Sequence, residues 1–194
     1  MRAVVTSIAI LAGAVVLAGC VSPTGRGQVA LRQGRYDAAA ARFEQALAED
    51  PGRVDSLVGL GISRYKLGNV EEAVRALTEA VGRAPGSAAA QLYLGLAHLR
   101  KGDTAGADEH LARFVQLGAE PRLAAHVDRV IRLLGSGPLP DGLRAFVAAG
   151  VEDQADWARD LNDTRVALRE EQLRRFAYYD YPLFLAPIPR CRCS

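Results

Sequence analysis

The residues best suited to covalent or metal chemistry are the three cysteines. Two of them, Cys191 and Cys193, stand one residue apart at the end of the chain. In an oxidising compartment such a pair could close a small strained disulfide, bind a soft metal weakly or pair between chains. No second cysteine pair or nearby histidine completes a zinc site, so no metal is predicted. An inert tail is the default interpretation.

The third cysteine, Cys20, closes an N-terminal segment with the features of an export signal. Arg2 precedes a mostly apolar run that ends at Ala18. This run is shorter than the roughly 20 residues that span a bilayer comfortably. It ends in Leu17-Ala18-Gly19-Cys20, which resembles the lipobox of bacterial lipoproteins. A plain secretory signal with an incidental cysteine is the alternative.

The lipobox resemblance implies cleavage before Cys20 and attachment of lipid to that residue. Residues 1–19 would then be a signal peptide and residues 20–26 a lipidated linker. Two or more acyl chains hold a protein firmly to a membrane, so the resemblance implies a stable anchor. Val21, where aspartate would stand under the enteric sorting rule, favours the outer membrane. We expect the mature domain to face the periplasm.

Composition and motifs argue against an enzyme. The net charge of +2 does not suggest a nucleic-acid partner. No phosphate-binding loop, His-Glu-x-x-His or Gly-x-Ser-x-Gly motif occurs. His98, His110 and His126 are scattered over separate predicted helices, and a core role is expected for His98. We predict no catalytic residues, no cofactor beyond the lipid and no small-molecule substrate; hydrolysis by acidic residues of the C-terminal third is the remaining alternative.

The middle of the chain follows a repeat of 34 residues. Glycine, alanine and large apolar side chains recur at this interval, which predicts one pair of antiparallel helices per period. The small residues allow the helices to approach closely, and the glycines end the first helix of each pair. The recurring positions are Gly34, Gly68 and Gly102; Ala39, Ala73 and Ala107; Phe43, Leu77 and Leu111; Ala46, Ala80 and Phe114; Pro51 and Pro85; and Leu60-Gly61 and Leu94-Gly95.

This pattern resembles the tetratricopeptide repeat. The resemblance covers residues 27–119, with an incomplete first repeat, and implies an all-α solenoid of helical hairpins. The sequence departs from the family at two positions of each repeat. Leu57 and Gln91 stand where the family has tryptophan, and Arg64 and His98 replace its tyrosine. These departures weaken the packing predictions without threatening the fold.

About two and a half repeats need a cover for the open end. Residues 120–137 supply one, because Leu123, Val127, Val130, Ile131 and Leu134 form one apolar stripe, which predicts a capping helix. Residues 138–181 are a predicted helical extension, with a short helix from Leu143 to Ala149 and a longer one from Asp153 to Tyr178. The longer helix is interpreted as solvated with one half-buried stripe. Pairing with another chain is the alternative, since Leu161, Leu168 and the residues around Phe176 are spaced near heptads.

In this family the first helix of each pair lines a concave groove. The partner-facing positions map to Val58, Ile62, Tyr65, Leu92, Leu96 and Leu99. Some members of the family grip a peptide carboxylate with lysine and asparagine at these places, which Val58, Ile62, Leu92 and Leu96 cannot do. Two occupants are considered for the groove. Either the protein's own C-terminal region fills it, with the Pro-rich tail of residues 182–194 as the natural candidate, or an apolar helix or strand of a partner docks there.

The sequence therefore predicts a membrane-anchored periplasmic adaptor that binds a protein partner of the cell envelope. Pilotin-like helpers of envelope machines are the nearest analogy among lipoproteins of this type. The alternative from another class is a redox or metal-handling accessory that acts through Cys191 and Cys193.

Overall fold

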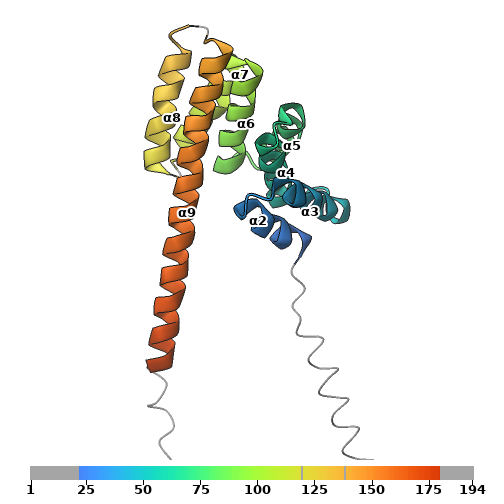
Figure 1. The fold of residues 1–194 in the computed structure, drawn as a ribbon, viewed down its shortest axis with the longest axis vertical. Helices are drawn as coiled ribbons and strands as arrows, with labels where there is room; N and C mark the ends of the chain where they lie inside the picture. Colours follow the sequence, from blue (N-terminus) through green and yellow to red (C-terminus); the bar gives the residue numbers. More distant parts are fainter. Residues whose placement is uncertain (1–21, 119, 138, 180–194) are drawn as a thin grey trace, which may run out of the picture. The chain divides into compact units, whose positions relative to one another are not determined.

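The structure is a computed structural model that describes residues 22–118, 120–137 and 139–179. This part is all-α and contains no strand (Figure 1). Its helices are α2 (Pro23–Arg32), α3 (Tyr36–Glu49), α4 (Val54–Lys66), α5 (Val70–Arg83), α6 (Ala88–Lys101), α7 (Thr104–Leu117), α8 (Pro121–Leu134) and α9 (Asp141–Tyr179). The leader, Cys20, the tail of residues 182–194, Cys191 and Cys193 lie outside the described residues, and so do the predictions made for them.

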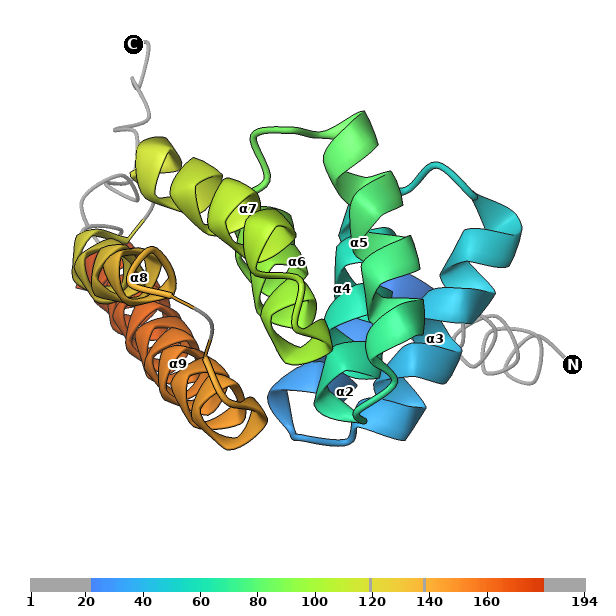
Figure 2. The ribbon, with the colours of Figure 1, turned by 90° about the horizontal axis from the view of Figure 1, so that it is seen from above.

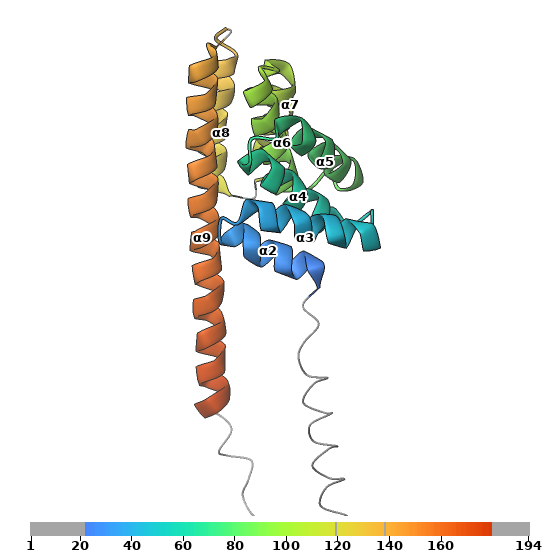
Figure 3. The ribbon, with the colours of Figure 1, turned by 45° about the vertical axis from the view of Figure 1, so that its right-hand side comes forward.

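Helices α2 to α7 form three hairpins, each made of neighbours in the sequence. Helix α2 packs on α3, α4 on α5, and α6 on α7. Each hairpin also packs on the next through α3 and α4 or through α5 and α6, and the first helices contact one another from α2 to α4 and from α4 to α6. Figure 2 shows this succession from above, and Figure 3 shows α2 and α3 side by side. The predicted helical-hairpin solenoid is therefore confirmed.

Glycines make the turns within the hairpins. Gly34, Gly68 and Gly102 have φ angles of 70°, 82° and 81°. This left-handed conformation is costly for residues with a Cβ atom, so glycine ends each first helix at little cost. Pro51 and Pro85 follow the ends of α3 and α5 and prevent either helix from continuing. The repeat interval seen in the sequence is thus the interval between turns.

A second set of glycines lets the two helices of each hairpin pack closely. A Cβ atom at Gly27 would lie 2.7 Å from Cε1 of Phe43, and one at Gly95 would lie 2.7 Å from Cγ of Leu111. Gly61 faces Leu77 in the same way. These large side chains are completely buried, as are the alanines of the second helices. The residues with no exposure are Phe43, Leu77 and Leu111, with Ala39, Ala73 and Ala107.

The capping helix spans the predicted segment. Helix α8 begins at Pro121 and ends at Leu134, and it packs on α7. Its buried residues include Leu123, Val127 and Val130, whereas its arginines point to solvent. The apolar stripe therefore covers the end of the third hairpin, as the spacing indicated.

The C-terminal helix differs from the prediction. The sequence indicated two helices with a break between Ala149 and Asp153, but α9 is continuous from Asp141 to Tyr179. No proline falls within it, and Gly150 in its interior weakens a helix without breaking it. Asp153 is therefore an interior residue of α9 and does not begin a separate helix. Contacts divide the chain into two units after Ala148, and residues 149–179 are described by themselves.

Candidate protein-binding surfaces

The six residues of the predicted groove lie on α4 and α6, which contact each other. Val58 is half-buried, whereas the other five are buried, with at most 5% of any one exposed. A partner would reach these five only after the atoms that cover them had moved. The groove stays a prediction, and Val58 is its accessible member.

Tyr65 of this set, together with Tyr93 and Arg100, joins α4 to α6. The rings of Tyr65 and Tyr93 meet edge to face, with centroids 5.5 Å apart. The guanidinium of Arg100 lies 4.2 Å from the centroid of Tyr65 and donates a hydrogen bond of 3.3 Å to its carbonyl oxygen. Aromatic and cation–π contacts add to the burial energy of such side chains. This end of the groove is therefore held in a fixed geometry.

An open hollow of about 500 Å³ lies among α3, α4 and α5, and the sequence analysis did not foresee it. Apolar side chains supply part of its lining and charged side chains the rest. The lining residues are Glu44, Leu47, Pro51, Leu57, Leu60, Arg64, Glu72, Arg75, Ala76 and Glu79. A surface of this kind suits an apolar side chain that carries polar neighbours.

Arg64 links the walls of this hollow. From α4 its guanidinium forms ion pairs with Glu44 of α3 and, at 3.1 Å, with Glu72 of α5. The Arg64 side chain is 26% exposed, so these pairs are partly shielded from water. They join the second helices of neighbouring hairpins across the helix between them.

The hollow coincides with the departures from the repeat pattern. Leu57 and Arg64, which both line it, stand where the family has tryptophan and tyrosine. Leucine is smaller than tryptophan, and the arginine head group turns toward carboxylates. Space that two aromatic rings would fill is therefore left open. The substitutions noted in the sequence were the signal that could have revealed the hollow.

A second, smaller hollow of about 310 Å³ lies one repeat further along. Val81, Gln91 and His110 line it at the positions equivalent to Leu47, Leu57 and Ala76 in the first. Glu109, Arg113 and Gln116 complete the lining. The repeat thus produces two related hollows, and in the second Gln91 and His110 stand where the first has Leu57 and Ala76.

Gln91 and His110, which line the second hollow, form a row of contacts with His98. Nδ1 of His110 lies 2.9 Å from Oε1 of Gln91, whose Nε2 donates a 3.0 Å hydrogen bond to the Pro85 carbonyl. The amide oxygen accepts, so Nδ1 of His110 carries the hydrogen. His110 also stacks on His98, with centroids 5.5 Å apart. Burial lowers the pKa of His110 because a charged imidazole loses solvation there.

His98 is held by the capping residue of α7. Its Nδ1 lies 2.7 Å from Oδ2 of Asp103, while Oδ1 of Asp103 accepts a 3.0 Å hydrogen bond from the Gly106 N–H. That backbone hydrogen bond is the main reason why the pKa of Asp103 is lowered. His98 takes part in a partly exposed polar cluster, not in a purely apolar core. Among the described residues no group of three or more His, Cys, Asp or Glu is placed to hold a metal ion.

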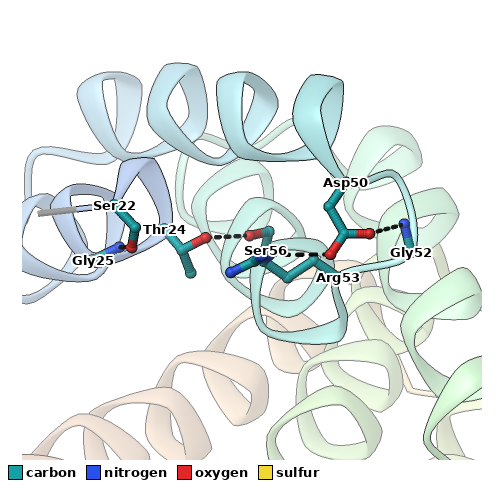
Figure 4. A network of polar contacts seen from close by, with 7 residues as sticks. All are labelled: Ser22, Thr24, Gly25, Asp50, Gly52, Arg53 and Ser56. Carbon is teal, nitrogen blue, oxygen red and sulfur yellow. Dashed lines mark hydrogen bonds and ion pairs between the residues drawn. The ribbon is translucent and has the colours of Figure 1, made fainter. Parts of the chain in front are cut away.

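Polar contacts fix the first helix to the second hairpin (Figure 4). Ser22 caps α2 by accepting a 3.2 Å hydrogen bond from the Gly25 N–H, and the hydroxyls of Thr24 and Ser56 lie 2.9 Å apart. Beside them, Asp50 accepts from the Gly52 N–H at 3.2 Å and pairs with Arg53 at 3.3 Å. The folded domain therefore begins two residues after Cys20, and residues 23–26, which the sequence analysis assigned to a linker, lie in α2. No helix in residues 22–118, 120–137 or 139–179 is both long and apolar enough to cross a bilayer.

These features define an all-α solenoid of helical hairpins with a capping helix and a C-terminal helical extension. Two models of the tetratricopeptide repeat match the chain, one over residues 30–78 and the other over residues 58–120. Residues 30–120 are therefore tetratricopeptide repeats, as the 34-residue interval indicated. No curated protein has a significant sequence match to this chain.

Solved structures share the fold at low sequence identity. The type III secretion translocator chaperone SycD of Yersinia enterocolitica is 18% identical, with a TM-score of 0.56 over 60% of this chain and 83% of that one. PcrH, solved with the chaperone binding region of PopD, is 23% identical, with a TM-score of 0.53 over 57% and 86%. MamA is 20% identical, with a TM-score of 0.53 over 85% and 96%. The likeness concerns the fold.

Proposed function

We propose that this protein is a lipid-anchored adaptor of the bacterial envelope, which holds a tetratricopeptide domain at a membrane to bind a protein partner. The repeats of residues 30–120 carry the proposal, because a solenoid offers an extended surface for a protein partner. PcrH was solved with a region of PopD, and SycD with a peptide of YopD. Both support protein binding as the use of this fold.

The hollow among α3, α4 and α5 is the accessible place for such a partner. It is open to solvent and has an apolar floor at Leu57 and Leu60. The groove at Val58 is the second candidate surface. An apolar side chain of the partner, inserted into either, would supply the buried anchor on which protein interfaces depend.

The binding proposal is tested with a photo-crosslinking amino acid placed in the full chain in cells. We expect one protein to be captured from Arg75, at the hollow, or from Val58, at the groove. The matched control is Arg42, which is exposed on α3 and lines neither surface. No adduct from either test position, or the same adducts from Arg42, would contradict the adaptor role.

The anchor is tested separately by growth with labelled palmitate. We expect label on the unchanged chain and none on Cys20→Ser. An unlabelled natural chain would refute the lipid anchor and leave the binding proposal standing. Fractionation of the outer and inner membranes then tests the location expected from Val21.

A further inference from the structure

Helix α9 carries large apolar side chains that the described chain leaves in water. All residues from 162 to 175 are exposed. Trp157 is 51% exposed and Leu168 is 61% exposed. Most helical stability in proteins comes from packing of an apolar face and not from propensity alone. This segment is therefore expected to pack its exposed apolar side chains against another helix.

The charges of this helix are separated along its length. Residues 152–163 contain five acidic residues and one arginine, whereas residues 164–175 contain four arginines and two glutamates. A second copy of α9 in the opposite direction would place the acidic half of each helix against the basic half of the other. Electrostatic complementarity of this kind fixes orientation and register.

Three apolar residues and one threonine form a seam that fits the same arrangement. Trp157, Leu161, Thr164 and Leu168 are spaced by four, three and four residues, as the inner positions of a two-stranded coiled coil are. In the antiparallel orientation Leu168 packs on Trp157 of a second copy, and Leu161 on its Thr164. Both Trp157 and Leu168 are among the exposed side chains. Each residue of the seam therefore has a packing partner in the seam of a second copy.

Charges beside and within the seam select the antiparallel orientation. With Leu168 on Trp157 of a second copy, Asp153 lies opposite Arg174 of that copy, and both residues are exposed in the single chain. A parallel pair would instead bring Glu171 against Glu171 within the seam. Like charges in direct opposition are destabilising. From these observations we propose that residues 153–175 of α9 form an antiparallel helical pair with a second copy of this chain.

Charge reversal tests the pairing in the full chain, purified in detergent and followed by sedimentation. Asp153→Arg and Arg174→Asp, each alone, should weaken the dimer by about tenfold or more, because the two equivalent pairs then become repulsive. The two reversals in one chain should restore it, since the opposite charges face each other again. The control is Asp37→Arg, a charge reversal at an exposed residue of α3, which should leave the dimer unchanged.

Disulfide trapping in membranes tests the orientation. With Cys191 and Cys193 replaced by serine, a chain carrying Asp153→Cys and a chain carrying Arg174→Cys should cross-link when they are expressed together. A chain with Asp153→Cys alone should not. Cross-linking of Asp153→Cys to itself would overturn the antiparallel arrangement. A natural chain that stays monomeric, or a dimer indifferent to both single reversals, would overturn the pairing and leave α9 to another occupant.

Discussion

Replacing Gly95 by alanine adds one methyl group to the interface between α6 and α7. The new Cβ atom would lie 2.7 Å from Cγ of Leu111, 2.8 Å from its Cδ2 and 3.2 Å from its backbone nitrogen. Carbon atoms pack best at about 3.5–4.0 Å, so Leu111 would have to withdraw by about 1 Å. Leu111 has no exposed surface, and α7 would have to move with it. The clash therefore falls on a part of the core that cannot yield easily.

The expected cost combines two opposing effects. Overpacking a core by one methyl group costs about 1–3 kcal/mol, and contact with a branch point and backbone places this site near the upper end. Alanine in a helix interior returns about 1 kcal/mol relative to glycine. We expect Gly95→Ala to lower the free energy of unfolding by about 1–2 kcal/mol. At this site the cost of overpacking therefore exceeds the gain in helix propensity.

Urea denaturation, followed by helical circular dichroism, measures the effect against a matched control. Gly82 is exposed on α5, and a Cβ atom there would have no neighbour within 4 Å. Gly82→Ala should therefore gain up to about 1 kcal/mol. In addition, Leu111→Ala should make Gly95→Ala less costly, because the missing branch leaves room for the methyl group. If Gly95→Ala matched Gly82→Ala in stability, the close-approach argument would be refuted.

Three further changes have defined outcomes. Leu57→Trp should fill the hollow among α3, α4 and α5 and raise stability by about 1 kcal/mol on denaturation, and it should abolish capture from Arg75 if a partner occupies the hollow. Asp103→Ala removes the cap of α7 and should cost about 1 kcal/mol at neutral pH. Because the pKa of Asp103 is lowered in the folded chain, this difference should vanish as the pH falls through that value. His110 has a pKa lowered from 6.5, so the unfolded chain takes up its proton first and stability is lost as the pH falls below 6.5; His110→Gln should reduce this loss in midpoints measured from about pH 7 to about pH 5.

The repeats and the cap could be predicted from the sequence because few residue types suit their positions. A left-handed turn at Gly34, Gly68 or Gly102 and a notch facing a large side chain both call for glycine, so the spacing reports directly on geometry. The capping helix could also be predicted, because the apolar stripe of α8 lies between Pro121, which begins the helix, and Gly135, which follows its last residue.

The first hollow and the continuity of α9 could not be predicted, because neither is marked by residues that recur at the repeat interval. The first hollow arises because Leu57 and Arg64 leave space, and the size of that space depends on how α3 and α5 close around it. The continuity of α9 was missed because Asp153 was interpreted as the start of a second helix. Aspartate, like the nearby Gly150, is tolerated inside a long helix when no proline or competing turn interrupts it.

If Cys20 carries the proposed lipid, the capped start of α2 limits how far the domain can stand from the membrane. Ser22 accepts the Gly25 N–H and begins the folded structure, so only Val21 separates it from the proposed lipid-bearing residue. Two residues of extended chain reach at most about 7 Å. That is about the thickness of one headgroup layer. An anchored copy would therefore be held close to the bilayer surface, and its partner would have to bind it there.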